Sequence, residues 1–430
     1  MFTLHFGTDG IRGVYGEEIT DETAFRLGMA LGAEGRVLLA RDNRVSSPRL
    51  AAAFLGGVAS VGGECTYYGL ATTPALYYAS TRTDAPYAVM ITASHNPPTH
   101  NGLKVFGREG KLDEVGRDRL TEKMLSASFP RVIYRRREED DFLQREYRAF
   151  FSRAIGDLSG VSAVVDYAGG AGYAFCDLLS SLGADVTAMN VRETGEKVNV
   201  GCGALCPEAV REETLRRKAD VGFALDGDGD RIIAVSRDGD ILDGDALLYL
   251  LARERMKAGA LPKGKIALTV MTNSGVLRSL SEVGVEVVLC GVGDAAVTAA
   301  MRSEGLSLGG EQSGHIVLGD LMMTGDGLLV GGTLMKIIKE GGSIVKPREL
   351  IVYPQVRYNV PVPDTSVANA ESVRSLAICV QDALGGGRVL VRASGTENVV
   401  RVMVECPEKE VAERAARELV AEIERAAKGA

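Results

Sequence analysis

The chain has 430 residues, of which 46% are hydrophobic and 25% are charged, and it contains only 13 prolines. This composition indicates a folded globular protein, and the length predicts three or four domains. The formal net charge of −8 excludes an overall positive field that would attract nucleic acid or an anionic membrane. An anionic ligand therefore requires a local cationic pocket.

The N-terminal sequence MFTLHFGTDGIRG lacks a basic segment followed by a long apolar core. No stretch of the chain approaches the roughly 20 apolar residues of a membrane span. We therefore expect a cytoplasmic protein with no membrane partner. Seven cysteines, spread from Cys65 to Cys406, form no disulfide framework. Cys202 and Cys206 form one close pair, which is weak evidence for zinc without a second pair or a nearby histidine.

Short β-branched segments alternate with helical segments over most of the chain, a pattern typical of parallel α/β layers. Three rounds of this alternation predict three related α/β domains at 1–140, 141–256 and 257–362. In chain order, the predicted elements are a strand at 36–40, a helix at 48–62, strands at 87–91, 161–166 and 184–189, a helix at 207–218, strands at 221–225, 265–270 and 286–290, and a helix at 325–340.

The C-terminal part has a different pattern. A segment at 353–364 is punctuated by prolines and predicts a linker or an edge strand, because proline cannot donate to a strand ladder. A helix, two short strands around the loop ASGTEN and a last helix from 408 then predict a small α+β domain at 363–430. The charged run RRREEDD at 135–141 is interpreted as a solvated junction between the first two domains.

The segment TASHNPP at 92–98 directly follows the predicted strand YAVMI. Pro97 and Pro98 fix φ and lack a backbone N–H, so the strand must end there in a rigid loop. Ser94 is therefore expected at the end of a strand, where it faces a ligand. The residues alone leave open whether Ser94 caps a turn or carries a phosphate. A serine hydrolase would need a G-x-S-x-G turn, which this segment lacks.

The segment ALDGDGDR at 224–231 follows the apolar strand VGFAL and carries Asp226, Asp228 and Asp230. Carboxylates this close repel one another unless a cation lies among them, and an all-oxygen site suits Mg²⁺ or Ca²⁺. An EF-hand is excluded, because it needs glycine and glutamate where Arg231 and Arg237 stand. A phosphatase nucleophile and an acidic surface turn stay as alternatives. Mg²⁺ usually also takes phosphate oxygens, which a phosphorylated serine would supply.

Two further segments carry polar side chains suited to a phosphosugar. In GGEQSGH at 309–315, Glu311, Ser313 and His315 alternate, so in an extended strand they would face one side and offer partners to sugar hydroxyls. The segment RASGTENVVR at 392–401 predicts a loop that surrounds an anion, because arginine suits phosphate. Its candidate residues are Arg392, Ser394, Gly395, Thr396 and, from the next strand, Arg401.

Together these segments resemble the α-D-phosphohexomutase superfamily and, within it, the phosphoglucosamine mutases. FGTDGIRG, TASHNPP with NGLKVF just after it, DGDGDR, GEQSGH and RASGTENVVRVMVE occur in the family's order and span nearly the whole chain. The resemblance implies an α/β fold of three topologically related α/β domains plus a smaller C-terminal α+β domain around a central cleft.

The resemblance also implies roles for individual residues. The implied catalytic residues are Ser94 as the phosphoserine, Arg12, His95 and Lys104. The implied ligands of Mg²⁺ are phosphorylated Ser94, Asp226, Asp228 and Asp230. The implied substrate-binding residues are Glu311, Ser313, His315, Arg231, Arg392, Ser394, Gly395, Thr396 and Arg401.

The implied reaction interconverts glucosamine 6-phosphate and glucosamine 1-phosphate through a phosphoserine and a bisphosphorylated sugar, with a hexose 1,6-bisphosphate as activator. The chain departs from the family at 293–297, where it reads GDAAV instead of G-D-R-Y-V. It also has Ala393 and Asn398 where the family often has prolines. The alternatives are therefore a phosphomannomutase or phosphoglucomutase, and a non-catalytic phosphosugar-binding paralogue. A homodimer is left open.

Overall fold

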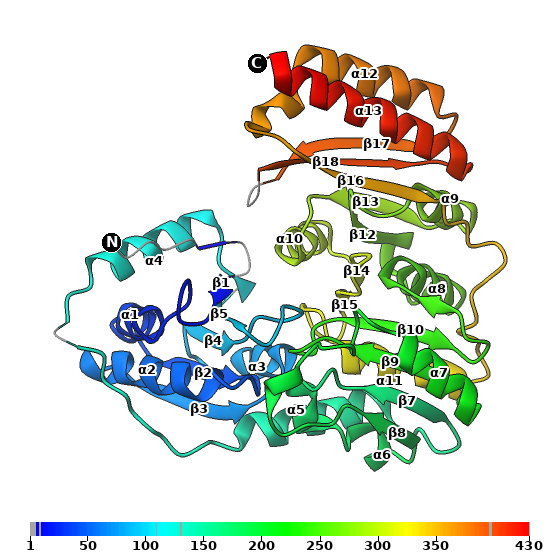
Figure 1. Cartoon of the computed structure of the whole chain (residues 1–430). Coiled ribbons are helices and arrows are strands. Elements are labelled where there is room, and N and C mark those ends of the chain that lie inside the picture. Colours follow the sequence, from blue (N-terminus) through cyan, green and yellow to red (C-terminus); the bar gives the residue numbers. More distant parts are fainter. Residues whose placement is uncertain (1–5, 8–9, 109, 130, 395–397, 430) are drawn as a thin grey trace. The chain divides into compact units, whose positions relative to one another are not determined.

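The computed structural model describes residues 6–7, 10–108, 110–129, 131–394 and 398–429 (Figure 1). The chain separates into two compact units. The first comprises Met1–Val270 and Val288–Lys346, and the second comprises Met271–Val287 and Pro347–Ala430. The first unit is built around three β-sheets and the second around one.

Three mixed β-sheets make up the first unit. Their strands are β1 (Ile11–Val14), β2 (Val37–Arg41), β3 (Cys65–Leu70), β4 (Tyr87–Ile91), β5 (His100–Gly107), β6 (Gly110–Lys111), β7 (Ser162–Asp166), β8 (Asp185–Met189), β9 (Val221–Leu225), β10 (Ile232–Ser236), β11 (Ile241–Leu242), β12 (Lys265–Thr269), β13 (Glu286–Cys290, within this unit from Val288), β14 (Leu308–Gly310) and β15 (Ile316–Leu318).

One strand order recurs in all three sheets. The first has the order β3-β2-β4-β5-β1, the second β8-β7-β9-β10-β11 and the third β13-β12-β14-β15. In each sheet the second and third strands of this order are parallel, and the third turns back into an antiparallel fourth. The prediction of three topologically related α/β domains is therefore confirmed.

Helices cover these sheets and connect their parallel strands. They are α1 (Asp21–Gly32), α2 (Ser47–Ser60), α3 (Thr73–Ser80), α4 (Glu114–Ser126), α5 (Phe142–Ile155), α6 (Leu178–Ser181), α7 (Glu208–Arg217), α8 (Gly244–Lys257), α10 (Asp294–Glu304) and α11 (Gly327–Lys339). Short 3₁₀ helices lie at Ala171–Phe175, Gly195–Lys197, Pro262–Gly264 and Thr365–Asn369.

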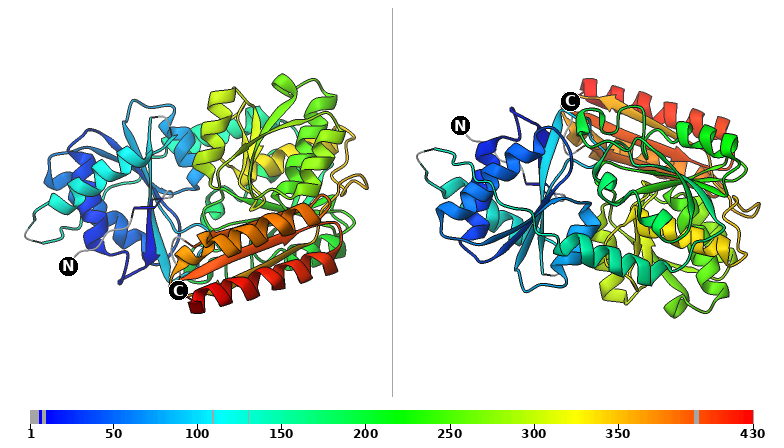
Figure 2. Two further views of the ribbon diagram at one scale, coloured as in Figure 1. Left: turned by 90° about the horizontal axis from the view of Figure 1, so that it is seen from above. Right: turned by 90° about the horizontal axis from the view of Figure 1, so that it is seen from below.

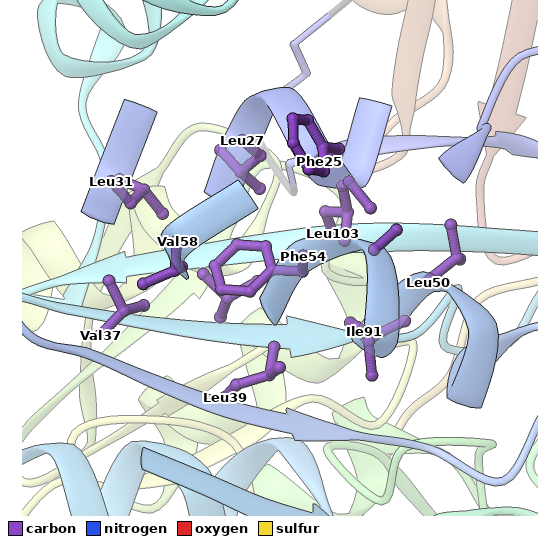
Figure 3. Close-up of a cluster of buried hydrophobic side chains, with 14 of the residues drawn as sticks. Phe25, Leu27, Leu31, Val37, Leu39, Leu50, Phe54, Val58, Ile91 and Leu103 are labelled. Carbon is purple, nitrogen blue, oxygen red and sulfur yellow. The ribbon is translucent and has the colours of Figure 1, made fainter. Parts of the chain in front are cut away.

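The core of the first sheet explains why α1 and α2 pack on it. Leu50, Phe54 and Val58 of α2 are spaced by four residues, so they lie on one helix face, and Figure 3 shows them among the buried side chains. The two helices approach closely because Gly28 of α1 lacks a side chain: a Cβ there would lie 2.2 Å from the carbonyl oxygen of Phe54. This core supports the strands whose ends carry the candidate site.

The second unit contains one antiparallel sheet. Its strands are β16 (Gln355–Pro361), β17 (Arg388–Ala393) and β18 (Val399–Glu405), in the order β16-β18-β17, and its helices are α9 (Ser274–Glu282), α12 (Glu371–Ala383) and α13 (Lys409–Gly429). Figure 2 shows α12 and α13 side by side on this sheet. Their buried apolar side chains and those of the strands form one core. The predicted edge strand at 353–364 is confirmed as β16. Of the helices in the described part of the chain, none is both long and apolar enough to cross a membrane.

Candidate active site

Three hairpin loops of the first unit meet at one cavity of about 250 Å³. Each loop joins the third strand of its sheet to the fourth: 92–99 between β4 and β5, 226–231 between β9 and β10, and 311–315 between β14 and β15. The cavity is lined by Ser94, Lys104, Asp230, Arg231, Val292, Gly293, Asp294, Glu311, Ser313 and His315. Equivalent positions of three repeated folds thus supply one site.

Ser94 lies in the first of these loops and is almost fully buried, at 1% exposure. Its φ of 52° is in the left-handed region, an uncommon conformation for a residue with a side chain. Its hydroxyl donates a hydrogen bond of 2.6 Å to Oδ2 of Asp226, and its backbone N–H donates to Oγ1 of Thr92 at 3.0 Å. The predicted position of Ser94 at the end of a strand is confirmed, because β4 ends at Ile91.

The aspartates of the second loop form a compact buried cluster. Oxygen atoms of Asp226, Asp228 and Asp230 all lie within 4.8 Å of one another. The ammonium of Lys104 donates to Oδ2 of Asp228 at 2.6 Å and to Oδ2 of Asp230 at 2.9 Å. Thr73, in the first turn of α3, also donates to Asp228. One lysine therefore compensates the charge of two carboxylates, and the third carboxylate is held by Ser94.

The carboxyl groups of the cluster have unequal proton affinities. Burial, together with the charges of Asp230 and Asp228, raises the pKa of Asp226 well above its usual value. Burial would also raise the pKa of Asp228 and Asp230, but the ammonium of Lys104 holds the pKa of Asp228 below its usual value and that of Asp230 well below it. The three carboxyl groups therefore repel one another, and Lys104 offsets this repulsion for Asp228 and Asp230 but not for Asp226.

These residues fit a hard divalent cation. Oδ1 of Asp228 and Oδ1 of Asp230 are buried, and within the described chain neither has a hydrogen-bond partner. Buried carboxylate oxygens without donors are costly unless a cation satisfies them. Because all the candidate ligands are oxygen atoms, the donor set suits Mg²⁺ rather than zinc.

His95 and Arg12 lie near this cluster. Burial, with the positive charges of Arg231 and Arg12, lowers the pKa of His95 to about 4, so its imidazole is neutral at pH 7. Nδ1 of His95 lies 3.4 Å from the hydroxyl oxygen of Ser94. Arg12 stands on β1 opposite Gly102 of β5. The described residues that line the cavity include neither Arg12 nor His95.

The third loop corrects one expectation from the sequence. Residues 311–315 do not form an extended strand but a tight turn, in which Gly314 donates to the carbonyl of Glu311 at 3.0 Å and Glu311 donates to that of His315 at 3.0 Å. Gly314 permits the turn because its φ is 90°. Glu311, Ser313 and His315 nevertheless all line the cavity. They lie together as expected, but a turn brings them together and not the alternation of an extended strand.

His315 has a defined tautomer in this turn. Its Nε2 accepts a hydrogen bond of 3.2 Å from the backbone N–H of Gly325, so the ring proton is on Nδ1. Nδ1 lies 3.9 Å from Oδ2 of Asp230. The buried imidazole therefore faces the aspartate cluster with its N–H.

Sequence reasoning missed three residues that line the cavity, Val292, Gly293 and Asp294. Val292 and Gly293 precede α10, and Asp294 is its first residue. The backbone N–H of Gly293 donates to Oε1 of Glu311 at 3.0 Å. Asp294 is paired with Lys111 of β6. The sequence contains one signal for these residues, which is that the segment GDAAV differs from the family pattern.

The remaining candidates belong to the second unit. Arg392 of β17 is paired in register with Arg401 of β18, and the backbone N–H of Ser394 donates to the carbonyl of Val399 at 3.0 Å. Gly395 and Thr396 lie outside the described residues. The predicted phosphate loop therefore spans a β-hairpin, with its two arginines side by side.

Comparison with known proteins identifies the family. Profiles described as Phosphoglucomutase/phosphomannomutase match the chain in three places: alpha/beta/alpha domain I at residues 3–130, alpha/beta/alpha domain III at 243–354, and the C-terminal domain at 358–422. The phosphoglucosamine mutase of Limosilactobacillus fermentum is 38% identical, over 96% of this chain and 96% of its own length. The chain belongs to the α-D-phosphohexomutase superfamily.

Further similarities agree with this assignment. The phosphoglucosamine mutase of Mycolicibacterium smegmatis is 38% identical to this phosphohexomutase, over 96% of this chain and 97% of its own. A solved phosphoglucomutase/phosphomannomutase family protein of Burkholderia thailandensis matches it with a TM-score of 0.83 at 25% identity, covering 99% of this chain and 98% of that one. This phosphohexomutase is an enzyme, a phosphotransferase of the mutase type.

Proposed function

We propose that this phosphohexomutase interconverts glucosamine 6-phosphate and glucosamine 1-phosphate through a phosphoserine at position 94 and a bisphosphorylated sugar. The observation that carries the proposal is the hydrogen bond of 2.6 Å between the Ser94 hydroxyl and Asp226, at the edge of a cavity. Support for glucosamine as the sugar comes from relatives named phosphoglucosamine mutase, which are 38% identical over 96% of this chain.

We further propose that Mg²⁺ is held by Asp226, Asp228 and Asp230 together with the phosphate on Ser94. The buried Oδ1 atoms of Asp228 and Asp230, which have no hydrogen-bond partner in the part of the chain that the structure describes, support this assignment. When bound, the ion supplies positive charge that neutralises the phosphoryl group in transfer. Lys104 lies against the same carboxylates and adds a second positive charge at the cavity wall.

The substrate would be bound by groups that line the cavity. Glu311 and Ser313 offer an acceptor and a hydroxyl to the sugar. Arg231 lines the same cavity, and its buried Nε, which lies 3.9 Å from Oδ1 of Asp230, has no hydrogen-bond partner among the described residues, so it can donate to a phosphate oxygen. We propose that the phosphate that is not transferred is held by residues of the second unit, Arg392, Ser394, Gly395, Thr396 and Arg401.

The proposed chemistry is two reciprocal phosphoryl transfers. The free hydroxyl of the hexose phosphate attacks the phosphorus on Ser94, the bond from phosphorus to the serine oxygen breaks, and the hydroxyl loses its proton. His95 is the proposed proton acceptor, because its Nδ1 lies 3.4 Å from the Ser94 hydroxyl oxygen and its imidazole is neutral at pH 7. The bisphosphate then reorients, the Ser94 hydroxyl attacks its other phosphorus, the bond from that phosphorus to the sugar oxygen breaks, and the serine proton passes to the sugar oxygen. A trace of hexose 1,6-bisphosphate would restore any enzyme that has lost its phosphate.

One experiment tests the proposed function. The purified enzyme is assayed with glucosamine, glucose and mannose phosphates under identical conditions, with Mg²⁺ and catalytic bisphosphate. We expect the highest kcat/KM with glucosamine phosphate. Intact-mass measurement should detect one phosphate group on the wild type and none on Ser94→Ala. An unphosphorylated wild type that gains no phosphate from the bisphosphate would overturn the phosphoserine mechanism.

A phosphomannomutase or phosphoglucomutase activity is the second candidate. The observation that favours it is the cavity-lining segment that begins α10, where Ala295 and Ala296 follow Asp294 instead of the arginine and tyrosine usual in phosphoglucosamine mutases. Higher kcat/KM with glucose or mannose phosphates would select this activity. Binding without turnover would indicate a non-catalytic paralogue, and steady release of phosphate without isomerisation would indicate a phosphatase.

Several related predictions have tests of their own. A cytoplasmic location can be checked by fractionation, and a homodimer by analytical ultracentrifugation. The domain limits 1–140, 141–256, 257–362 and 363–430, and the central cleft, also stay predictions, which limited proteolysis and an experimental structure with substrate would test.

A further inference from the structure

Arg44 and Asn199 contact the backbone of the Ser94 loop from two different α/β domains. We infer that they are positioning residues, which hold this loop in the one conformation that places the Ser94 hydroxyl on Asp226. Neither residue lines the cavity among the described residues, and neither was singled out as a site residue above. The kinetic part of this inference rests on the proposed function, whereas its structural part does not.

Arg44 is fully buried, and all five N–H groups of its guanidinium donate hydrogen bonds. Nε donates to Oδ2 of Asp42 at 2.9 Å. The other four donate to backbone carbonyls of the serine loop: Ser94 at 2.8 Å, Asn96 at 2.8 Å, Pro97 at 2.5 Å and His100 at 3.0 Å. Four carbonyls within seven residues therefore converge on one side chain.

Asp42 fixes the direction of Arg44. Its Oδ1 accepts from the backbone N–H of Arg44 at 3.0 Å and from the hydroxyl of Ser47, the first residue of α2, at 2.5 Å. Asp42 is itself fully buried, and its backbone N–H donates to the carbonyl of Ile91 at the end of β4. The ion pair is therefore anchored to the same strand from which the serine loop leaves.

The loop needs such a partner because it has no regular structure. Backbone carbonyls that are buried away from water must find donors, and Pro97 and Pro98 remove two N–H groups from this segment. Arginine satisfies several carbonyls at once, since its planar fork directs its donors outward at fixed angles. Lysine offers three donors from a single atom and cannot reproduce this pattern.

Asn199 contacts the same loop from the second α/β domain. Its Nδ2 donates to the carbonyls of Ser94 at 2.8 Å and Asn96 at 3.1 Å. The Ser94 carbonyl thus accepts from both Arg44 and Asn199, which fixes the peptide that follows the left-handed Ser94. Because that peptide is trans, the N–H of His95 is turned the opposite way. Two independent donors, Arg44 and Asn199, therefore hold Ser94 in its strained conformation.

Two substitutions test the inference, each with a matched control. Arg44→Lys is compared with Arg26→Lys, because Arg26 also donates to two carbonyls, those of Met124 and Ala127, but away from the cavity. Asn199→Gly is compared with Asn190→Gly. Both asparagines are left-handed, with φ of 60° and 50°, so glycine keeps the backbone, and Asn190 donates to Asp166 instead of the serine loop.

Two measurements separate positioning from simple stability. In Arg44→Lys and Asn199→Gly, we expect kcat to fall by about 100-fold while KM changes by less than about threefold, because the serine is misplaced and the sugar-binding turn is intact. Hydrogen exchange of peptides that cover 92–101 should accelerate in both variants. The controls should show neither change, with the thermal unfolding midpoint recorded for all four.

The outcomes distinguish failure of this inference from failure of the proposed function. A folded Asn199→Gly with wild-type kcat and wild-type exchange at 92–101 would overturn the inference. Should Arg44→Lys fail to fold, Asn199→Gly alone decides. If the wild type lacks mutase activity, the proposed function fails, and the exchange comparison still decides whether the two side chains hold the loop.

Discussion

The hydroxyl of Ser94 lies 2.6 Å from the carboxylate of Asp226, although the two residues are 132 positions apart in the chain. They meet because they occupy equivalent places in two repeated folds: each follows the third strand of its sheet, β4 or β9, in a hairpin loop. The third repeat places Glu311, Ser313 and His315 in the corresponding loop. A repeated topology thus brings a hydroxyl, a carboxylate cluster and the proposed sugar-binding groups to one cavity.

Lys104 should be essential for the stability of the cation-free protein. It is 3% exposed and pairs with Asp228 and Asp230. In Lys104→Ala two buried carboxylates lose their counter-charge, so we expect the free energy of unfolding to fall by about 3–5 kcal/mol in EDTA, measured by urea denaturation. Lys257→Ala is the control, because Lys257 is 62% exposed and pairs with Glu254 at the surface. Equal losses in both variants would contradict the prediction.

Mg²⁺ should stabilise the folded enzyme through the aspartate cluster. A ligand that binds only the folded state at about 100 times its Kd adds about 2.7 kcal/mol, so the unfolding midpoint should rise with added MgCl₂. Asp228→Asn should reduce this rise, because it removes one charged ligand. Asp238→Asn, at an exposed turn, should behave as the wild type. If Asp228→Asn responds to Mg²⁺ as strongly as Asp238→Asn does, the cluster is not the site.

Gly227 should tolerate no side chain. A Cβ at this position would lie 2.5 Å from the carbonyl oxygen of Ser94 and 3.0 Å from Nδ2 of Asn199. Gly227→Ala must therefore push the serine loop away from the aspartates, and we expect kcat to fall by at least about tenfold. The matched control is Gly291→Ala, where the nearest atom to a new Cβ is 3.7 Å away. Unchanged kcat in a folded Gly227→Ala would show that the two loops separate without cost.

Asp326 should make stability fall as pH rises. It caps α11 and accepts a hydrogen bond of 2.6 Å from Tyr147, and burial raises its pKa from 3.8 to about 6. The folded state then binds this proton more tightly than the unfolded state. Its contribution is complete well below pH 3.8 and is lost as pH rises through 6, a total change of about 3 kcal/mol.

Asp326→Asn isolates this effect, because asparagine also caps helices and accepts from Tyr147. The free energy of unfolding of the wild type, minus that of the variant, should fall by about 2 kcal/mol between pH 4 and pH 7, measured by denaturation at each pH. Parallel pH profiles for the two proteins would mean that Asp326 does not hold its proton more tightly in the folded state.

Much of this protein's structure can be predicted from its sequence, because it depends on local chemistry. Pro97 and Pro98 keep the segment after β4 out of a strand, which leaves Ser94 in a loop. The apolar run VGFAL predicts the buried strand that Asp226, Asp228 and Asp230 follow. The repeated alternation of strands and helices indicated three related domains. Each of these inferences depends on interactions between near neighbours in the chain, which a sequence pattern records directly.

Only the tertiary structure decided which distant groups meet. The turn at 311–315 depends on packing of Gly314 against β10, where a Cβ would lie 2.2 Å from the carbonyl of Ile232. Lys104 reaches aspartates 124 and 126 positions away, and Arg44 reaches carbonyls 50 to 56 positions away. Nothing in the spacing of residues specifies such partners, because they are brought together by the packing of whole sheets and by the demand that every buried charge and carbonyl find a partner.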